Sequence, residues 1–209
     1  MTKYIGILLF PDMEELDFAG PYEVLAAFGM YVDKSWQVVT VAQHPAPVTG
    51  NKGLVVVPHH SFADCPPLEV IVVPGGQGTR VEVDNEVFMD FVRRTGQAAS
   101  WVTSVCTGAF ILSRAGFLDG KRATTYWAVH DQLRAEPGIR EVVKERFVRD
   151  GNVITAAGVS AGIDMALYLV AQLKDVEAAR LTQKLIEYYP EPPFAEQAAV
   201  AIGEETRSW

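Results

Sequence analysis

Cys106 lies at the junction between an apolar, β-branched run and a stretch with helical spacing. The pattern predicts a buried strand over residues 100–105, followed by a helix whose small residues suit close packing on a sheet. The first N–H groups and the dipole of such a helix favour the thiolate, which is the nucleophilic form of cysteine. Small flanking residues also allow the sharp bend of a nucleophile elbow. The spacing therefore predicts a reactive centre at Cys106, with a buried structural thiol as the alternative.

Two other predicted strands end in residues that could act beside a thiolate. Asp17 follows the apolar run 4–10, and Gly75 and Gly76 follow the run 70–73. Because the carboxyl ends of parallel strands line one crevice, we expect these segments to meet. A carboxyl group could hold or deliver a proton, and the glycine N–H groups could cradle negative charge. The alternatives are a helix N-cap at Asp17 and a plain turn at the two glycines.

Other candidate side chains carry weaker signals. Thr107 is either a helix-start residue or a hydroxyl of the site. Histidine is the usual base for a cysteine nucleophile, but His130 is also consistent with a surface or satisfied core histidine. Cys65 lies in a predicted turn, where we expect an inert thiol. The two cysteines and four histidines show no metal-ligand spacing, so we expect no metal site.

Length and composition predict one domain over residues 1–209. The chain is 49% hydrophobic and 21% charged, as is ordinary for a globular protein with a sizeable core. Its net charge of −8 offers no basic surplus for phosphates, so we expect neither nucleic acid nor a membrane surface as partner. The sequence shows no signal-peptide pattern and no apolar run of membrane-spanning length, which predicts a cytoplasmic protein.

Predicted strands and helices alternate along the chain. Strands are expected over 4–10, 36–41, 70–73 and 100–105, and hairpins over 48–58 and 146–155. Helices are expected over 17–28, with Pro21 in the first turn, and over 85–94, 107–115, 127–133, 163–174 and 176–188. This alternation predicts an α/β fold with a mostly parallel central sheet and helices on both faces. Residues 190–209 are expected to form a surface tail.

The motifs resemble those of the ThiJ/PfpI superfamily. They are Leu16-Asp17-Phe18-Ala19-Gly20-Pro21, Val73-Pro74-Gly75-Gly76 and Ser104-Val105-Cys106-Thr107-Gly108, and further shared stretches extend from Tyr4 to about Pro193. Within the superfamily the sequence is most similar to the isonitrile hydratases. The resemblance implies a flavodoxin-like α/β sandwich of the class I glutamine amidotransferase type. It also implies a homodimer, a small-molecule isonitrile substrate and no cofactor.

For the site, the resemblance implies Cys106 as the nucleophile, Asp17 as the acid that hydrogen-bonds it, and Thr107 as the neighbouring site residue. The implied reaction converts an isonitrile, R–N≡C, into an N-substituted formamide through a thioimidate on Cys106. We expect the apolar walls around the R group to be Leu16, Phe18, Tyr126 and Trp127. Tyr126 occupies a position where many family members carry His, which argues against a Cys–His hydrolytic pair and a peptidase.

Three alternative functions use the same sulfur or the same fold. One is a glyoxalase or deglycase-like enzyme acting on reactive carbonyls, and another is a thiol redox sensor. The third is a regulatory domain, because the amino-terminal domains of some AraC-type transcription factors share these motifs. Those proteins continue into a helix-turn-helix region, whereas this sequence ends at Trp209 with a net charge of −8, so we do not expect DNA binding.

Overall fold

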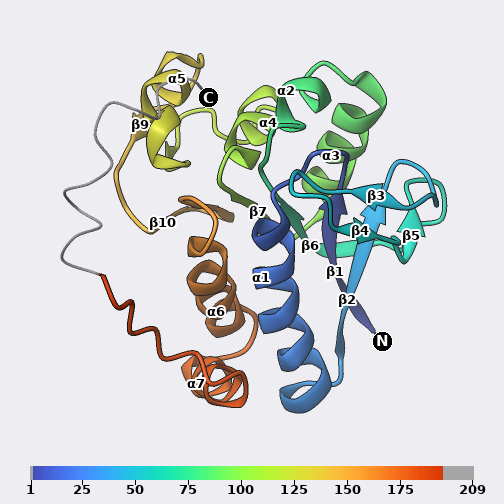
Figure 1. Cartoon of the computed structure of the whole chain (residues 1–209), viewed down its shortest axis with the longest axis vertical. Helices are drawn as coiled ribbons and strands as arrows, with labels where there is room; N and C mark the ends of the chain where they lie inside the picture. The colour runs from blue at the N-terminus through green and yellow to red at the C-terminus, as the bar shows by residue number, and fades with distance from the viewer. Residues whose placement is uncertain (1, 195–209) are drawn as a thin grey trace.

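A seven-stranded sheet forms the centre of the computed structural model, which describes residues 2–194 (Figure 1). Its strand order is β10-β11-β7-β6-β1-β2-β5. All neighbouring strands run parallel except β10, which pairs antiparallel with β11. The strands are β1 (Lys3–Leu9), β2 (Trp36–Ala42), β5 (His60–Ser61), β6 (Leu68–Val73), β7 (Trp101–Val105), β10 (Phe147–Asp150) and β11 (Val153–Ala156).

Helices cover both faces of this sheet. On one face α1 (Glu15–Ala27), α6 (Ala161–Leu173) and α7 (Val176–Leu185) pack against one another. Since α1 lies on β1 and β2, and α6 lies on β7 and β11, their mutual contact closes this face above β6. Helix α3 (Glu86–Ala98) also contacts β6 and therefore lies on the opposite face, together with α2 (Thr79–Glu82) and α4 (Gly108–Arg114). The predicted mostly parallel α/β fold is confirmed.

Shorter elements complete the structure. The hairpin predicted over 48–58 is confirmed by the antiparallel pair β3 (Val48–Thr49) and β4 (Val55–Val56). The pair β8 (Arg122–Ala123) and β9 (Glu141–Val142) flanks a 3₁₀ turn, η2 (Trp127–Val129), and α5 (His130–Ala135). A π-helical segment, η1 (Phe28–Val32), extends α1. The β3–β4 hairpin, α2 and α5 lie around the end of the molecule at which the parallel strands finish (Figure 1).

Continuous apolar runs build the core because the central parallel strands are covered on both faces. Ile5 and Ile7 of β1 and residues 70–73 of β6 are wholly buried. Such strands need no alternation of polar and apolar residues. Their solvent-free packing fixes the strand ends, and hence the loops that carry the candidate site.

The first helix differs from its prediction. It begins at Glu15, so Asp17 lies in its first turn rather than in a capping position, and Glu14 is the N-cap residue. Pro21 is inside the helix rather than in its first turn. There it packs near Gly162 of α6, where an added Cβ would approach Pro21 Cγ to 3.1 Å. Packing between α1 and α6 thus accommodates a residue that removes a helical hydrogen bond.

The remaining predicted helices agree in position, with the 127–133 segment divided between η2 and α5. No helix within residues 2–194 combines the length and apolarity needed to cross a membrane. Most of the predicted surface tail, residues 195–209, lies outside the described part of the chain.

Candidate active site

Cys106 marks the point where the chain passes from β7 to α4. Its φ of 56° lies in the left-handed region, which costs a residue with a side chain about 1–3 kcal/mol. Hydrogen bonds hold this conformation from both sides. The Cys106 N–H donates to the carbonyls of Ala156 and Ala157, at 3.1 and 2.9 Å, and Thr125 Oγ1 donates to the Cys106 carbonyl at 2.8 Å. The surrounding chain therefore fixes where the thiol points.

Two glycines allow the backbone segments around Cys106 to approach closely. A Cβ added to Gly75 would lie 2.8 Å from Cys106 Cβ and 2.5 Å from the Thr107 nitrogen. One added to Gly108 would lie 2.2 Å from the Val73 carbonyl oxygen. Because all three distances are shorter than those that real Cβ atoms make, only glycine at these two positions allows the end of β6 to lie against the start of α4.

Asp17 is a wholly buried carboxyl group from the first turn of α1. Its Oδ2 accepts a hydrogen bond from the Gly75 N–H at 2.9 Å, and its Oδ1 has no partner among the described residues. Burial raises the pKa of Asp17 to about 8, and the charge of Glu14 adds to this, although the Gly75 N–H acts against it. The carboxyl group is therefore protonated at neutral pH.

The Cys106 thiol is also buried, with 6% of its surface exposed. Burial raises the pKa of Cys106, and negative charge on Asp17 raises it further, while the N–H groups of Thr107 and Val159 lower it. Burial thus outweighs the helix-start effect that the sequence suggested. The two acids are coupled, so a thiolate forms most readily while Asp17 keeps its proton.

Gly76 of the predicted glycine cradle lines the cavity that contains Cys106, but the N–H groups of both glycines are bonded within the protein. The Gly75 N–H is bound to Asp17, and the Gly76 N–H donates to Thr107 Oγ1 at 2.9 Å. Thr107 makes no helix-capping hydrogen bond, although it occupies the N-cap position of α4. Its hydroxyl instead ties the β6 loop to the residue beside the cysteine. The amides that act on the sulfur belong to Thr107 and Val159.

A cavity of about 390 Å³ opens onto Cys106. Its buried and half-buried walls include Cys106, Thr107, Tyr126, Val129 and Val159. Its rim contains the half-buried Glu14, Gly76 and Gln77 and the exposed Asn51, Lys52 and Arg80. An apolar interior beside the sulfur and a charged rim are typical of a small-molecule site.

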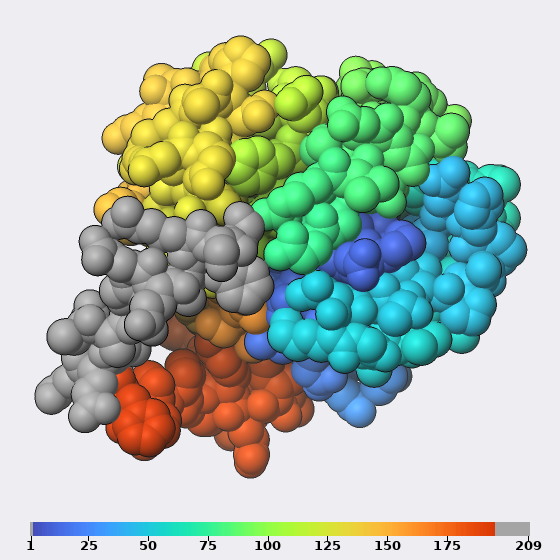
Figure 2. All heavy atoms as spheres, turned by 45° about the horizontal axis from the view of Figure 1, so that its top comes forward, coloured from blue at the N-terminus to red at the C-terminus, as the bar shows by residue number. Residues whose placement is uncertain are grey.

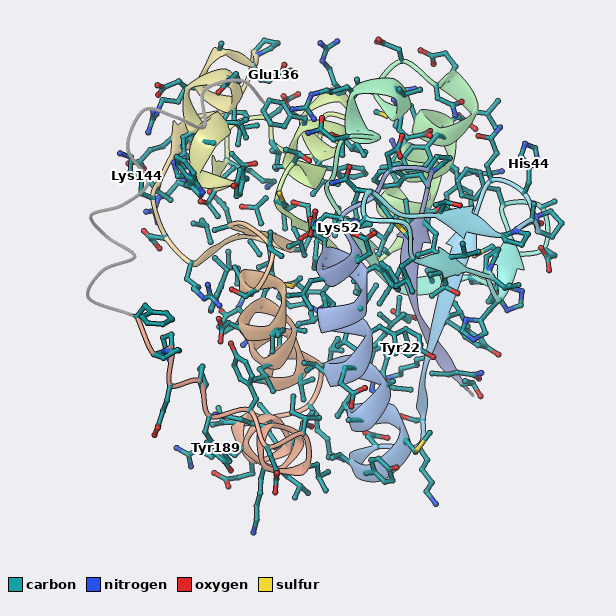
Figure 3. All side chains as sticks on the ribbon, in the orientation of Figure 1. Tyr22, His44, Lys52, Glu136, Lys144 and Tyr189 are labelled. Carbon is teal, nitrogen blue, oxygen red and sulfur yellow. The ribbon has the colours of Figure 1, made fainter. Side chains whose placement is uncertain are left out.

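Lys52 places the β3–β4 hairpin over this rim. Its ammonium group forms an ion pair with Glu14 and lies 3.7 Å from a Glu15 oxygen. Figure 3 shows Lys52 above the N-terminal end of α1. On the surface, the segments that contain this hairpin, α2 and α5 come together at the same end of the molecule (Figure 2).

Only some of the predicted pocket residues lie at this cavity. Tyr126 lines it, whereas Trp127 lines a neighbouring hollow together with His130. Leu16 is exposed and Phe18 is buried in the core, so neither is a wall residue. The reason is helical geometry: successive residues of a helix point about 100° apart, so the neighbours of Asp17 turn away from it.

No histidine within residues 2–194 lines the cavity that contains Cys106. His130 Nε2 lies 3.5 Å from Thr124 Oγ1, and burial lowers its pKa. Residues 2–194 also contain no cluster of three or more His, Cys, Asp or Glu side chains that could hold a metal ion. The titratable groups that interact at this site are therefore the Cys106 thiol and the Asp17 carboxyl group, each of which shifts the pKa of the other.

The contributors that were not identified from the sequence include Thr125, Val159 and Arg80. Thr125 fixes the Cys106 carbonyl, Val159 brings an N–H group to the sulfur, and Arg80 is part of the rim. The small-residue run 156–162 between a strand and a helix was a usable signal for Val159, because such a loop follows the strand beside β7. Val159 has a φ of 47°, which is unusual for a β-branched residue.

Known proteins are similar to this chain in sequence and fold. Residues 3–172 match the DJ-1/PfpI family. The chain is 46% identical over 211 residues to an isonitrile hydratase of Pseudomonas putida, covering 99% of this chain and 90% of that protein. It is 27% identical over 176 residues to the HTH-type transcriptional regulator CdhR of Pseudomonas aeruginosa, of which the match covers 51%. A crystal structure of a ThiJ/PfpI family protein from Pseudomonas syringae superposes with a TM-score of 0.85 at 37% identity, covering 93% of this chain and 78% of that one.

Proposed function

The chain belongs to the DJ-1/PfpI family, and we propose that it is an isonitrile hydratase, which adds water to R–N≡C and releases the formamide R–NH–CHO. The similarity to the Pseudomonas putida hydratase extends over nearly the whole of both chains, which supports this activity. The observation that carries the proposal is the wholly buried Asp17 carboxyl group, which interacts with the Cys106 thiol and whose pKa burial raises to about 8.

Isonitrile chemistry requires this pairing because one carbon atom receives both reactants. The terminal carbon of R–N≡C is attacked by the nucleophile, and the electron pair that remains on that carbon must then take a proton. A nucleophile and an acid must therefore reach the same atom. Asp17 Oδ1, which has no partner among the described residues, is the oxygen that can deliver this proton.

In the first step, the Cys106 thiolate forms a C–S bond with the terminal carbon. The Asp17 proton is transferred to the same carbon, which gives the thioimidate R–N=CH–S–Cys106 and leaves Asp17 as a carboxylate. The Thr107 and Val159 N–H groups support the thiolate before the attack. We infer that the bend at Cys106 acts as a nucleophile elbow that holds the sulfur in the cavity.

In the second step, water adds to the thioimidate carbon. The Asp17 carboxylate accepts a proton from the water and passes it to the nitrogen. Collapse of the resulting R–NH–CH(OH)–S–Cys106 breaks the C–S bond and forms the formamide C=O, and the hydroxyl proton passes to the Asp17 carboxylate. The two water protons end on the nitrogen and on Asp17, so the site returns to its starting state without a cofactor.

Product analysis tests the reaction class. Wild-type protein and cyclohexyl isocyanide in water enriched in ¹⁸O are expected to yield N-cyclohexylformamide with one labelled oxygen, while methylglyoxal is not consumed. Consumption of methylglyoxal without formamide release would replace the proposal with carbonyl chemistry. If neither compound is consumed and peroxide oxidises Cys106, the result would favour a thiol sensor.

A further inference from the structure

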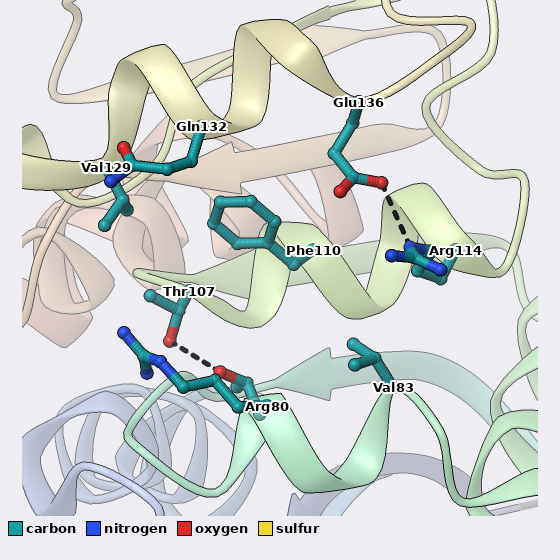
Figure 4. A pocket seen from close by; sticks show the side chains of 9 residues that line it. Arg80, Val83, Thr107, Phe110, Arg114, Val129, Gln132 and Glu136 are labelled. Atoms are coloured by element: carbon teal, nitrogen blue, oxygen red, sulfur yellow. Dashed lines mark hydrogen bonds and ion pairs between the residues drawn. The ribbon is translucent and has the colours of Figure 1, made fainter.

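A second cavity, of about 310 Å³, lies next to the one that contains Cys106 (Figure 4). The two cavities share Arg80, Thr107 and Val129 as lining residues. Beyond these shared residues the second cavity is lined by the apolar Val83 and Phe110 and by the polar or charged Thr79, Arg114, Gln132 and Glu136. Arg80 therefore lies in the wall that the Cys106 cavity shares with the second cavity.

Arg80 differs from the other cations of these walls in having no ion-pair partner among the described residues. Lys52 is paired with Glu14 and lies near Glu15. Arg114 pairs with Glu136 at 3.1 Å. Figure 4 shows the Arg80 side chain lying beside Thr107 and directed away from the Arg114–Glu136 pair.

Among the described residues, Arg80 is therefore the cation of these two cavity walls whose charge no carboxylate neutralises. A guanidinium group is planar and presents its N–H donors in a fork that matches a carboxylate. The Arg80 side chain is exposed toward the cavities rather than engaged by the protein. Its position beside Thr107 thus supplies a recognition point for an anion close to the reactive sulfur.

We propose that Arg80 determines substrate specificity by binding an anionic substituent, and that the preferred substrates are isonitriles whose R group carries a carboxylate. This inference rests on the proposed hydratase activity. The isonitrile carbon would meet Cys106, the body of R would contact Val129, and the carboxylate would pair with Arg80. Neutral isonitriles of similar size would still react, but without this interaction.

Matched substrates test the inference. We would measure kcat/KM for 4-isocyanobenzoate and for its neutral amide, 4-isocyanobenzamide, with wild type, Arg80→Gln and Arg94→Gln. Arg94 lines neither cavity and provides a control with the same change in net charge. Wild type is expected to prefer the carboxylate by roughly tenfold, the equivalent of about 1.4 kcal/mol. Arg80→Gln is expected to lose this preference, so that its kcat/KM values for the carboxylate and the amide become about equal.

Each contrary result has a distinct meaning. Equal use of both compounds by wild type, or a carboxylate preference that persists in Arg80→Gln, overturns the role of Arg80 and leaves the hydratase activity standing. A loss of preference in Arg94→Gln as large as in Arg80→Gln shows a general charge effect and also overturns it. Failure of wild type to hydrate either compound overturns the proposed function, and this inference with it.

Discussion

Replacement of Asp17 by asparagine should change how the stability of the protein depends on pH. The carboxyl group is wholly buried, and burial raises its pKa from 3.8 to about 8. Between these values the folded protein keeps a proton that the unfolded chain has released. Stability from this group is therefore greatest at low pH and falls as pH rises through this window. Each pH unit costs about 1.4 kcal/mol, so the loss between pH 4 and pH 7 is about 4 kcal/mol.

Asp17→Asn removes this titration and keeps an oxygen that can accept the Gly75 N–H. Urea unfolding at pH 5, 6, 7 and 8 would give the free energy of unfolding of both proteins. The free energy of unfolding of the variant minus that of wild type is expected to rise by about 1.4 kcal/mol per pH unit and to level off near pH 8. Asp90→Asn, which alters an exposed carboxylate, is the control. A difference that is independent of pH, or that shifts in favour of wild type, refutes a protonated Asp17.

Four further predictions follow from the same geometry. Because the reactive form of Cys106 and Asp17 holds one proton between them, kcat/KM for a neutral isonitrile should rise with pH toward about 8, and a fall between pH 6 and 8 would contradict this. Gly75→Ala should destabilise the fold by about 1–3 kcal/mol and impair turnover, because its added Cβ would meet the Cys106 side chain. Gly120→Ala, whose added Cβ meets nothing within 4 Å but whose φ of 68° strains the backbone, should lose stability through that strain alone and keep its turnover; an equal loss of turnover in the two variants would reject the close-packing argument. Thr107→Val removes the acceptor of the Gly76 N–H and should lower the melting temperature by the equivalent of about 1–2 kcal/mol, while Thr107→Ser should not. The homodimer stays a prediction, for which light scattering should give the mass of two chains rather than one.

Much of the fold could be predicted because its strands are covered on both faces. Residues 70–73 and 100–105 were predicted as buried strands because their apolar, β-branched runs are too short for helices and end in turn or helix signals, and β6 and β7 confirm them. The meeting of Asp17, Gly75 and Cys106 followed from one rule, that parallel strands end on the same edge. That rule needs no knowledge of the loops.

Features set by loop geometry could not be predicted in the same way. The Gly75 and Gly76 N–H groups were expected to face a ligand, but Asp17 and Thr107 accept their hydrogen bonds. Sequence spacing shows where amides occur and not what they bind. A start of α1 two residues earlier than predicted was enough to remove Leu16 from the cavity wall.

The pKa of the reactive thiol shows the same limit. Sequence reasoning predicts a low pKa for a cysteine at a helix start, because the helix N–H groups that lower this pKa are its neighbours along the chain. Burial depends on the whole fold, and at Cys106 it acts more strongly in the opposite direction. The reactivity of Cys106 therefore depends on the proton that the thiol shares with Asp17, and not on the sulfur alone.

The most direct test of the account is the rate of N-cyclohexylformamide formation from cyclohexyl isocyanide by wild type, Cys106→Ala and Cys65→Ala, with circular dichroism and melting curves to establish that each protein is folded. The account predicts product with wild type and with Cys65→Ala, and none above the uncatalysed rate with a folded Cys106→Ala. Turnover by Cys106→Ala close to the wild-type rate would contradict a covalent intermediate on Cys106.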